Sequence, residues 1–145
     1  MSAELLIANT LRIAGEDLAG ARLLSAAGNR NAIYLLEQAA EKIIRAVMTS
    51  ERIHAGIGHD LAAIVDQVPD ANLLKPRLRA VEHLAAYATA YRYPTSSARI
   101  KPAPPAQQIE SDATAVEALL HEAASRFGVD LASTGAPASS AAPIR

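Results

Sequence analysis

Apolar residues recur at helical spacing along most of the chain, in stretches separated by residues that favour turns. In residues 3–27 they recur every three or four positions, with charged residues outside the stripe, which predicts an amphipathic helix. A wider apolar stripe in residues 30–50 predicts a second helix that contacts more than one neighbour. Ser2 is placed to cap the first helix, and Gly28-Asn29 is placed to end it.

Three further helices are predicted in the rest of the chain. A short helix follows Asp60, a residue type that favours the N-cap position. A fourth helix is expected over residues 72–92, because Pro94 disfavours its continuation. The last helix is expected over residues 106–127, with Gly128 where a C-terminal glycine belongs.

Together these stripes predict an all-α fold, an antiparallel four-helix bundle with an additional short helix. Residues 1–128 are expected to form the bundle, and residues 129–145 a disordered tail rich in Ala, Ser and Pro, because the tail has little to bury. The composition agrees, since 33 of 145 residues are alanine and 3% are aromatic, which favours close-packed helices over an all-β fold. The surplus apolar surface of the second predicted helix favours a homodimer.

The composition excludes several classes of site. The chain has no cysteine, which rules out a disulfide scaffold, a thiolate metal site and a cysteine nucleophile. No apolar run approaches the ~20 residues of a membrane span and no leader pattern is present, so a cytoplasmic location is expected. The Glu-x-x-His spacing occurs once, in a predicted loop at residues 51–54, whereas a di-iron bundle needs two such pairs. Neither a metal site nor a cofactor is predicted.

The net charge of −1 hides an asymmetry along the chain. Six basic residues and one acid lie between Lys75 and Lys101, so this segment carries +5 and the remainder carries −6. Such a patch suits a phosphate-bearing ligand, nucleotide or RNA, although a solvated helix face explains the same residues. Arg92 continues the apolar stripe of the fourth predicted helix. Its guanidinium therefore either caps the end of that helix or holds a phosphate in a cleft.

Four short motifs resemble those of the HEPN family of small helical proteins. They are Glu16-Asp17-Leu18, then Glu37-Gln38-Ala39-Ala40-Glu41-Lys42 with Arg45-Ala46, then Gly58-His59-Asp60-Leu61, and finally Tyr91-Arg92-Tyr93-Pro94. Their order and spacing match as a set over about residues 3–127. The resemblance implies an all-α bundle that is often dimeric, a minimal nucleotidyltransferase as partner in a toxin–antitoxin pair, and a nucleotide or RNA as ligand.

The ribonuclease branch of that family carries an arginine and, four to six residues later, a histidine. Arg92 stands where this arginine would be, but no histidine follows it, and proton transfer near neutral pH needs such a group. Arg77 and His83 have a suitable separation, yet positions six apart on a continuous helix point about 120° away from each other. The resemblance therefore implies a HEPN protein without the nuclease pair, and no catalytic residue is predicted.

Three functions are consistent with this sequence. The first is a non-catalytic module that binds a nucleotide or a nucleotidyltransferase. Its cleft would lie around Arg92 and Tyr93, with Lys42, Arg45 and His59 as further candidates. Lys42 and Arg45 are equally explained as solubilising residues on the outer face of the second predicted helix. The other two functions are a metal-independent ribonuclease toxin and a helical adaptor that binds no small ligand.

Overall fold

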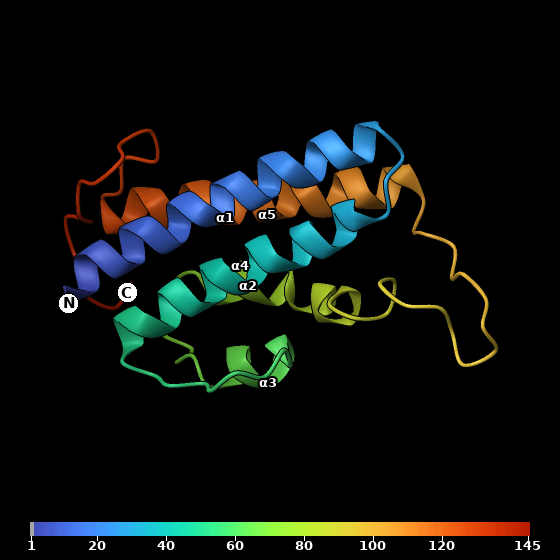
Figure 1. Ribbon diagram of the computed structural model, residues 1–145. Coiled ribbons are helices and arrows are strands. Elements are labelled where there is room, and N and C mark those ends of the chain that lie inside the picture. The colour runs from blue at the N-terminus through green and yellow to red at the C-terminus, as the bar shows by residue number, and fades with distance from the viewer. Residues whose placement is uncertain (1) are drawn as a thin grey trace.

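The computed structural model describes residues 2–145 and is helical, with no strand in that range. Its elements are α1 (Ala3–Ala26), α2 (Asn31–Glu51), α3 (Leu61–Asp66), α4 (Lys75–Arg79), the 3₁₀ helix η1 (Glu82–Tyr87) and α5 (Ala106–Phe127). The long helices α1, α2 and α5 pack together, α3 and η1 contact α2, and α4 contacts α5 (Figure 1). The predicted all-α bundle with an additional short helix is confirmed.

The helix ends coincide with the predicted capping residues. The hydroxyl of Ser2 and the carboxylate of Asp60 each accept a hydrogen bond from the backbone N–H three residues later, at 3.0 and 3.1 Å. Gly28 and Gly128 adopt φ values of +69° and +63°, which place them in the left-handed region where helices commonly end. These local signals explain why the boundaries of α1 and α5 follow the apolar stripes closely.

The fourth predicted helix differs from a continuous α-helix over residues 72–92. It is divided into α4 and η1, and its later backbone bonds join each residue to the third one before it. Leu78, Val81 and Leu84 are fully buried and lie three residues apart. The N–H of Val81 donates to the carbonyl of Leu78 and the N–H of Leu84 to that of Val81, at 3.2 and 3.1 Å, and these turns of three residues place the side chains on one stripe facing the core.

The C-terminal segment, residues 129–145, also differs from the expectation based on its composition. It forms no helix or strand, but it folds back along the end of the bundle where α1 begins (Figure 1). Ala138 and Ile144 are buried, and the carbonyl of Ile144 accepts a hydrogen bond from the N–H of Leu73 at 3.3 Å. Two apolar side chains and several backbone hydrogen bonds therefore attach a segment that composition alone predicts to be disordered.

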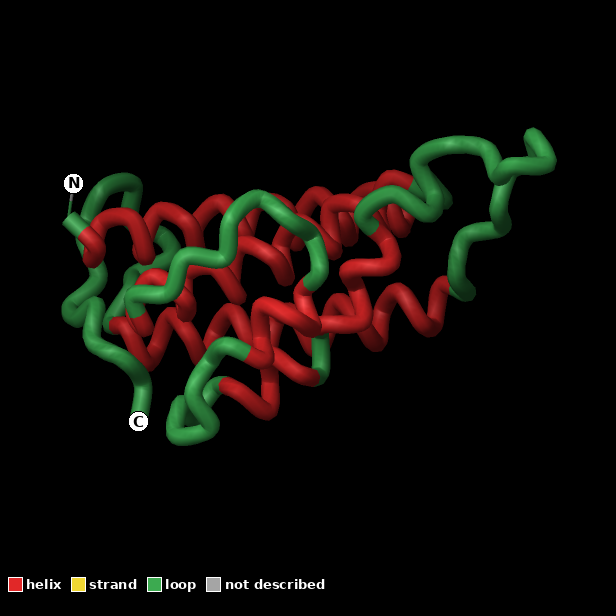
Figure 2. The backbone as a smooth tube through the Cα atoms, turned by 90° about the horizontal axis from the view of Figure 1, so that it is seen from below, coloured by secondary structure: helices red, strands yellow, loops and turns green. Residues whose placement is uncertain are grey.

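The connection from η1 to α5 extends away from the opposite end of the bundle, as Figure 2 shows. It carries the exposed residues Tyr93 and Ile100. The core itself is largely aliphatic, and α2 contributes to it on several sides because α2 contacts α1, α3, η1 and α5. The wide apolar stripe of α2 is thus covered within the chain, and the exposed apolar residues of the long helices lie on α1 instead: Leu5, Leu6, Ile13 and Leu23.

Candidate functional site

Three acidic residues are buried as whole residues, backbone included: Glu37 and Glu41 on α2 and Asp112 on α5. Glu37 and Glu41 are four residues apart, so they project from the same face of the helix. Their exposed fractions are 0% and 6%. A carboxylate removed from water needs hydrogen bonds or an opposite charge, so the surroundings of this pair are the first candidate region.

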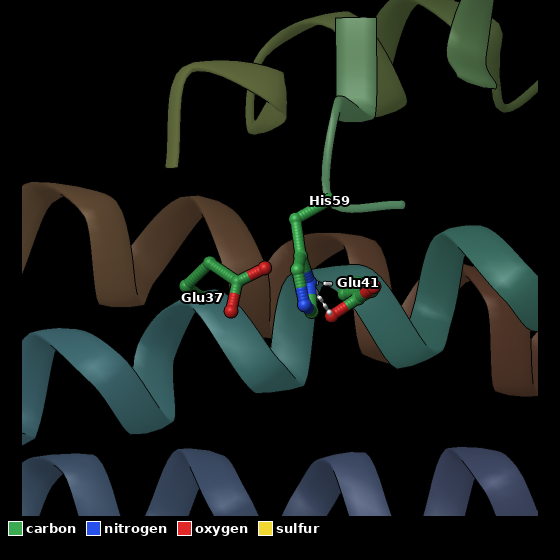
Figure 3. A group of neighbouring side chains, drawn as sticks. All are labelled: Glu37, Glu41 and His59. Atoms are coloured by element: carbon green, nitrogen blue, oxygen red, sulfur yellow. Dashed lines mark hydrogen bonds and ion pairs between the residues drawn. The ribbon is translucent and has the colours of Figure 1, made fainter. Parts of the chain in front are cut away.

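An imidazole completes this group, which we call the Glu37–Glu41–His59 cluster. His59 reaches α2 from the loop before α3, and its Nδ1 lies 3.2 Å from the carboxylate of Glu41 (Figure 3). Gln38 donates from Nε2 to Oε2 of Glu37 at 2.8 Å, and Arg45 donates from Nη2 to Oε1 of Glu41 at 3.1 Å. Oε1 of Glu37 is buried and has no hydrogen-bond partner among residues 2–145.

The protonation of Glu37 is shifted by this environment. Burial raises the pKa of Glu37 from 4.5 to about 7, opposed by the hydrogen bond from Gln38 and reinforced by the charge of Glu41. Near neutral pH, the Glu37 carboxyl group is therefore protonated in a substantial fraction of molecules. Perturbed acids of this kind are common at functional sites, although they also occur in structural networks.

Lys42 and Arg45, two of the predicted site residues, lie beside this cluster but are already paired. Lys42 forms an ion pair with Asp17 of α1 at 2.7 Å. Arg45 binds Glu41 and also donates to the carbonyls of Gly56 and Gly58, at 2.8 and 2.9 Å. Arg45 therefore fixes the loop that carries His59. Both cations also line a mainly apolar pocket of about 520 Å³ between the start of α1, the end of α2 and this loop.

Arg92 and Tyr93, the other principal candidates, lie at the opposite end of α2. The guanidinium carbon of Arg92 lies 4.4 Å from the ring centroid of Tyr34 and 5.8 Å from that of Tyr93. Lys101 lies in the same way against Tyr91, with 4.8 Å between Nζ and the ring centroid. We call these five residues the Arg92 cluster. The Arg92 guanidinium forms no hydrogen bond with residues 2–145, so it caps no carbonyl of the preceding helical segment.

A third arrangement was not predicted from the sequence. Asp112, which is 4% exposed, accepts a hydrogen bond from Nε2 of His83 at 2.9 Å and further bonds from Tyr87 and Gln108. Burial and the charge of Asp112 raise the pKa of Tyr87 to about 12, so Tyr87 remains a neutral donor. The available signal was the position of Asp112 on the apolar stripe of α5, three residues after Ile109.

Residues 7–124 match the family model described as HEPN domain. The chain belongs to the HEPN family. The matched span contains α2, the loop with His59 and the Arg92 cluster, and the resemblance carried by the four short motifs is confirmed. Comparison with curated proteins and with solved structures finds no significant match. Across residues 2–145, none of the helices combines the length and apolarity that crossing a bilayer requires.

Arg92 forms no hydrogen bond with a histidine ring among residues 2–145. His59 pairs with Glu41 and His83 pairs with Asp112, and Arg92 shares no hydrogen-bond partner with either ring within the described residues. The divergence of about 120° between Arg77 and His83 holds only for one continuous α-helix. Because α4 ends before His83 and η1 has three residues per turn, the 120° divergence expected for an α-helix does not apply here.

Proposed function

We propose that this HEPN protein binds a nucleotide, through its phosphates, at the Arg92 cluster and does not cleave it. The observation that carries the proposal is the stacking of the Arg92 guanidinium on Tyr34. Stacking occupies the face of the guanidinium and leaves its N–H donors at the edge. Those donors are suited to bind a phosphate in bidentate fashion.

The distribution of charge supports a phosphate-binding site at the same end of the bundle, around the Arg92 cluster. Of the six cations between positions 75 and 101, Lys75 and Arg79 form ion pairs with acids. The other four form none within the described part of the chain, and three of them, Arg92, Arg99 and Lys101, lie toward the connection before α5. The pocket beside Arg92 has a volume of about 250 Å³ and is lined by Arg30, Tyr91, Tyr93, Pro94 and Ile100. This volume suits a phosphate group, and the exposed ring of Tyr93 offers a surface on which a base can stack.

Replacing Arg92 by alanine is expected to weaken the binding of ATP at least tenfold, because a charge-assisted hydrogen bond contributes about 1.5–3 kcal/mol. Isothermal titration calorimetry with ATP, ADP and AMP measures the affinity and its dependence on phosphate number. Arg77→Ala is the matched control, since Arg77 is another exposed cation of the same basic segment without an ion pair in residues 2–145. An unchanged affinity in Arg92→Ala, or no binding by the parent protein, contradicts the proposal.

A metal-independent ribonuclease is the second candidate, and the His83–Asp112 pair favours it. A histidine held by a buried carboxylate, with its ring about half exposed, is an arrangement used for general acid–base catalysis. Incubation of the purified protein with total RNA in EDTA distinguishes the two functions. We expect no cleavage. Cleavage that persists in EDTA and is lost in His83→Ala would establish the ribonuclease instead.

Family membership supports two further proposals, a homodimer and a nucleotidyltransferase as partner in a cytoplasmic toxin–antitoxin pair. The exposed apolar residues of α1 supply a surface for either contact, since Leu6 and Ile13 are seven residues apart and so lie on one face of the helix. An adaptor that binds a helical protein and no small ligand would use the same surface. The ATP titration separates that adaptor from a nucleotide-binding protein.

A further inference from the structure

The Glu37–Glu41–His59 cluster brings three metal-binding side chains together. One ligand atom from each residue lies within 4.8 Å of the other two. The two carboxylates come from successive turns of α2. The imidazole comes from the loop before α3, which faces these turns (Figure 3). This grouping offers two carboxylate oxygen donors and one imidazole nitrogen, which are donors that a divalent transition metal accepts when no thiolate is present.

A separate observation indicates that the cluster lacks a partner. Oε1 of Glu37 is buried and accepts no hydrogen bond from residues 2–145, although the Glu37 side chain is fully removed from solvent. Buried polar atoms are nearly always hydrogen-bonded, because an unpaired one forfeits its hydration without compensation. The Glu37 carboxylate faces the His59 ring in Figure 3. A cation bound between them would supply the missing partner.

Neighbouring donors orient the carboxylates in the way that metal ligands are usually oriented. Gln38 binds Oε2 of Glu37, and Arg45 binds Oε1 of Glu41. Oε1 of Glu37 has no donor among residues 2–145, whereas Oε2 of Glu41 lies 3.2 Å from Nδ1 of His59 and 3.5 Å from Nε2 of Gln38, contacts that a bound ion would replace. Hydrogen bonds like those from Gln38 to Glu37 and from Arg45 to Glu41 hold the metal-binding side chains in position and increase the affinity for the metal.

The spacing also fits a metal of ordinary bond length. With metal–ligand distances of about 2.0–2.2 Å, neighbouring ligand atoms in a tetrahedral site lie about 3.3–3.6 Å apart. The His59–Glu41 separation is 3.2 Å, close to that value. Glu37 lies within 4.8 Å of these atoms, so binding of an ion requires its carboxylate to move closer to Glu41 and His59. The His59 side chain is 54% exposed, which leaves a route for the ion and room for water as a further ligand.

We propose that Glu37, Glu41 and His59 form a binding site for one divalent cation of the Zn²⁺ class. The nitrogen donor favours Zn²⁺ or Co²⁺ over Mg²⁺ and Ca²⁺, which prefer oxygen ligands throughout. The bound ion connects the loop before α3 to the middle of α2. This proposal is independent of nucleotide binding, because none of its ligands belongs to the Arg92 cluster.

The test uses the full chain after removal of metals with EDTA and dialysis. Calorimetric titration with Zn²⁺ is expected to give one ion per chain, and Co²⁺ is expected to develop a visible absorption band. Glu37→Gln and His59→Gln should each weaken the affinity for Zn²⁺ at least tenfold, a loss comparable to that seen on removing metal-site residues. Both substitutions keep side-chain size close to the original, and circular dichroism confirms that each variant is folded.

Two controls make the outcome decisive. His121→Gln removes another exposed imidazole and should leave the affinity within twofold of the parent protein. Arg92→Ala should also retain Zn²⁺ binding, so failure of one proposal is distinguishable from failure of the other. The metal site is excluded if the parent protein binds no Zn²⁺. The Glu37 and Glu41 carboxyl groups would then hold a proton in place of a metal ion. The site is equally excluded if His121→Gln weakens binding as much as His59→Gln, which would indicate adventitious surface binding.

Discussion

Replacing Glu37 by glutamine is expected to stabilise the metal-free protein at pH 8 by up to about 3 kcal/mol, and to change its stability little at pH 4.5. The pKa of Glu37 rises from 4.5 to about 7 on burial, so the folded chain holds a proton that the unfolded chain releases. In the parent protein, this group therefore lowers the free energy of unfolding progressively as pH rises from about 4.5 to about 7. Above pH 7 the penalty is constant. Glutamine carries no charge, so the Glu37→Gln variant does not pay this penalty.

Urea denaturation of both proteins in EDTA, at intervals from pH 4.5 to pH 9, measures this effect. The difference in unfolding free energy should grow between the two pKa values and then level off. Glu110→Gln is the control, because Glu110 is an exposed acid of α5 whose replacement should give no such pH-dependent difference. If the unfolding free energies of the parent protein and Glu37→Gln change with pH in parallel, burial does not raise the pKa of Glu37.

Placing a charge at Ile144 is expected to lower the free energy of unfolding by about 2 kcal/mol, and the Tm by about 5–10 °C. The Ile144 side chain is 6% exposed, and an aspartate there would either be buried without a partner or detach the segment from the bundle. Differential scanning calorimetry of Ile144→Asp measures the change.

Ile100→Asp is the matched control for this experiment. Ile100 is the same residue type, but it is 74% exposed in the connection before α5, so its replacement should change the Tm by less than 2 °C. Equal and negligible effects of the two substitutions would mean that residues 129–145 contribute nothing to stability, as the composition of the segment predicts.

The long helices could be predicted because their signals are local. The apolar stripes of residues 3–27 and 106–127 end at glycines in the left-handed conformation, and the structure places α1 and α5 within those limits. The helix type of the segment with Leu78, Val81 and Leu84 could not be predicted, because a spacing of three is compatible with both an α-helix and a 3₁₀ helix. The structure decides between them, with α4 and η1 in place of one long helix.

The sites depend on contacts that the sequence does not encode locally. Glu37 and Glu41 occur among Gln38, Lys42 and Arg45, a composition typical of a solvated helix face, and their burial depends on the segments that cover α2. Their convergence with His59 likewise depends on the path of a loop. Asp112 and His83 lie 29 positions apart and meet only because α5 packs beside η1. The place of Arg92 on an apolar stripe marks it as a candidate, whereas nothing in the sequence indicates its contact with Tyr34.

The partners of Arg92 have a consequence for how an anion would approach. Aromatic rings orient a guanidinium through their quadrupoles but carry no net charge, so they leave its full positive charge uncompensated. The resulting field extends into solvent, where physiological salt limits its reach to about 8 Å. For the proposed anion site we therefore expect ionic strength, more than pH, to govern binding, mainly through the association rate rather than the lifetime of the complex.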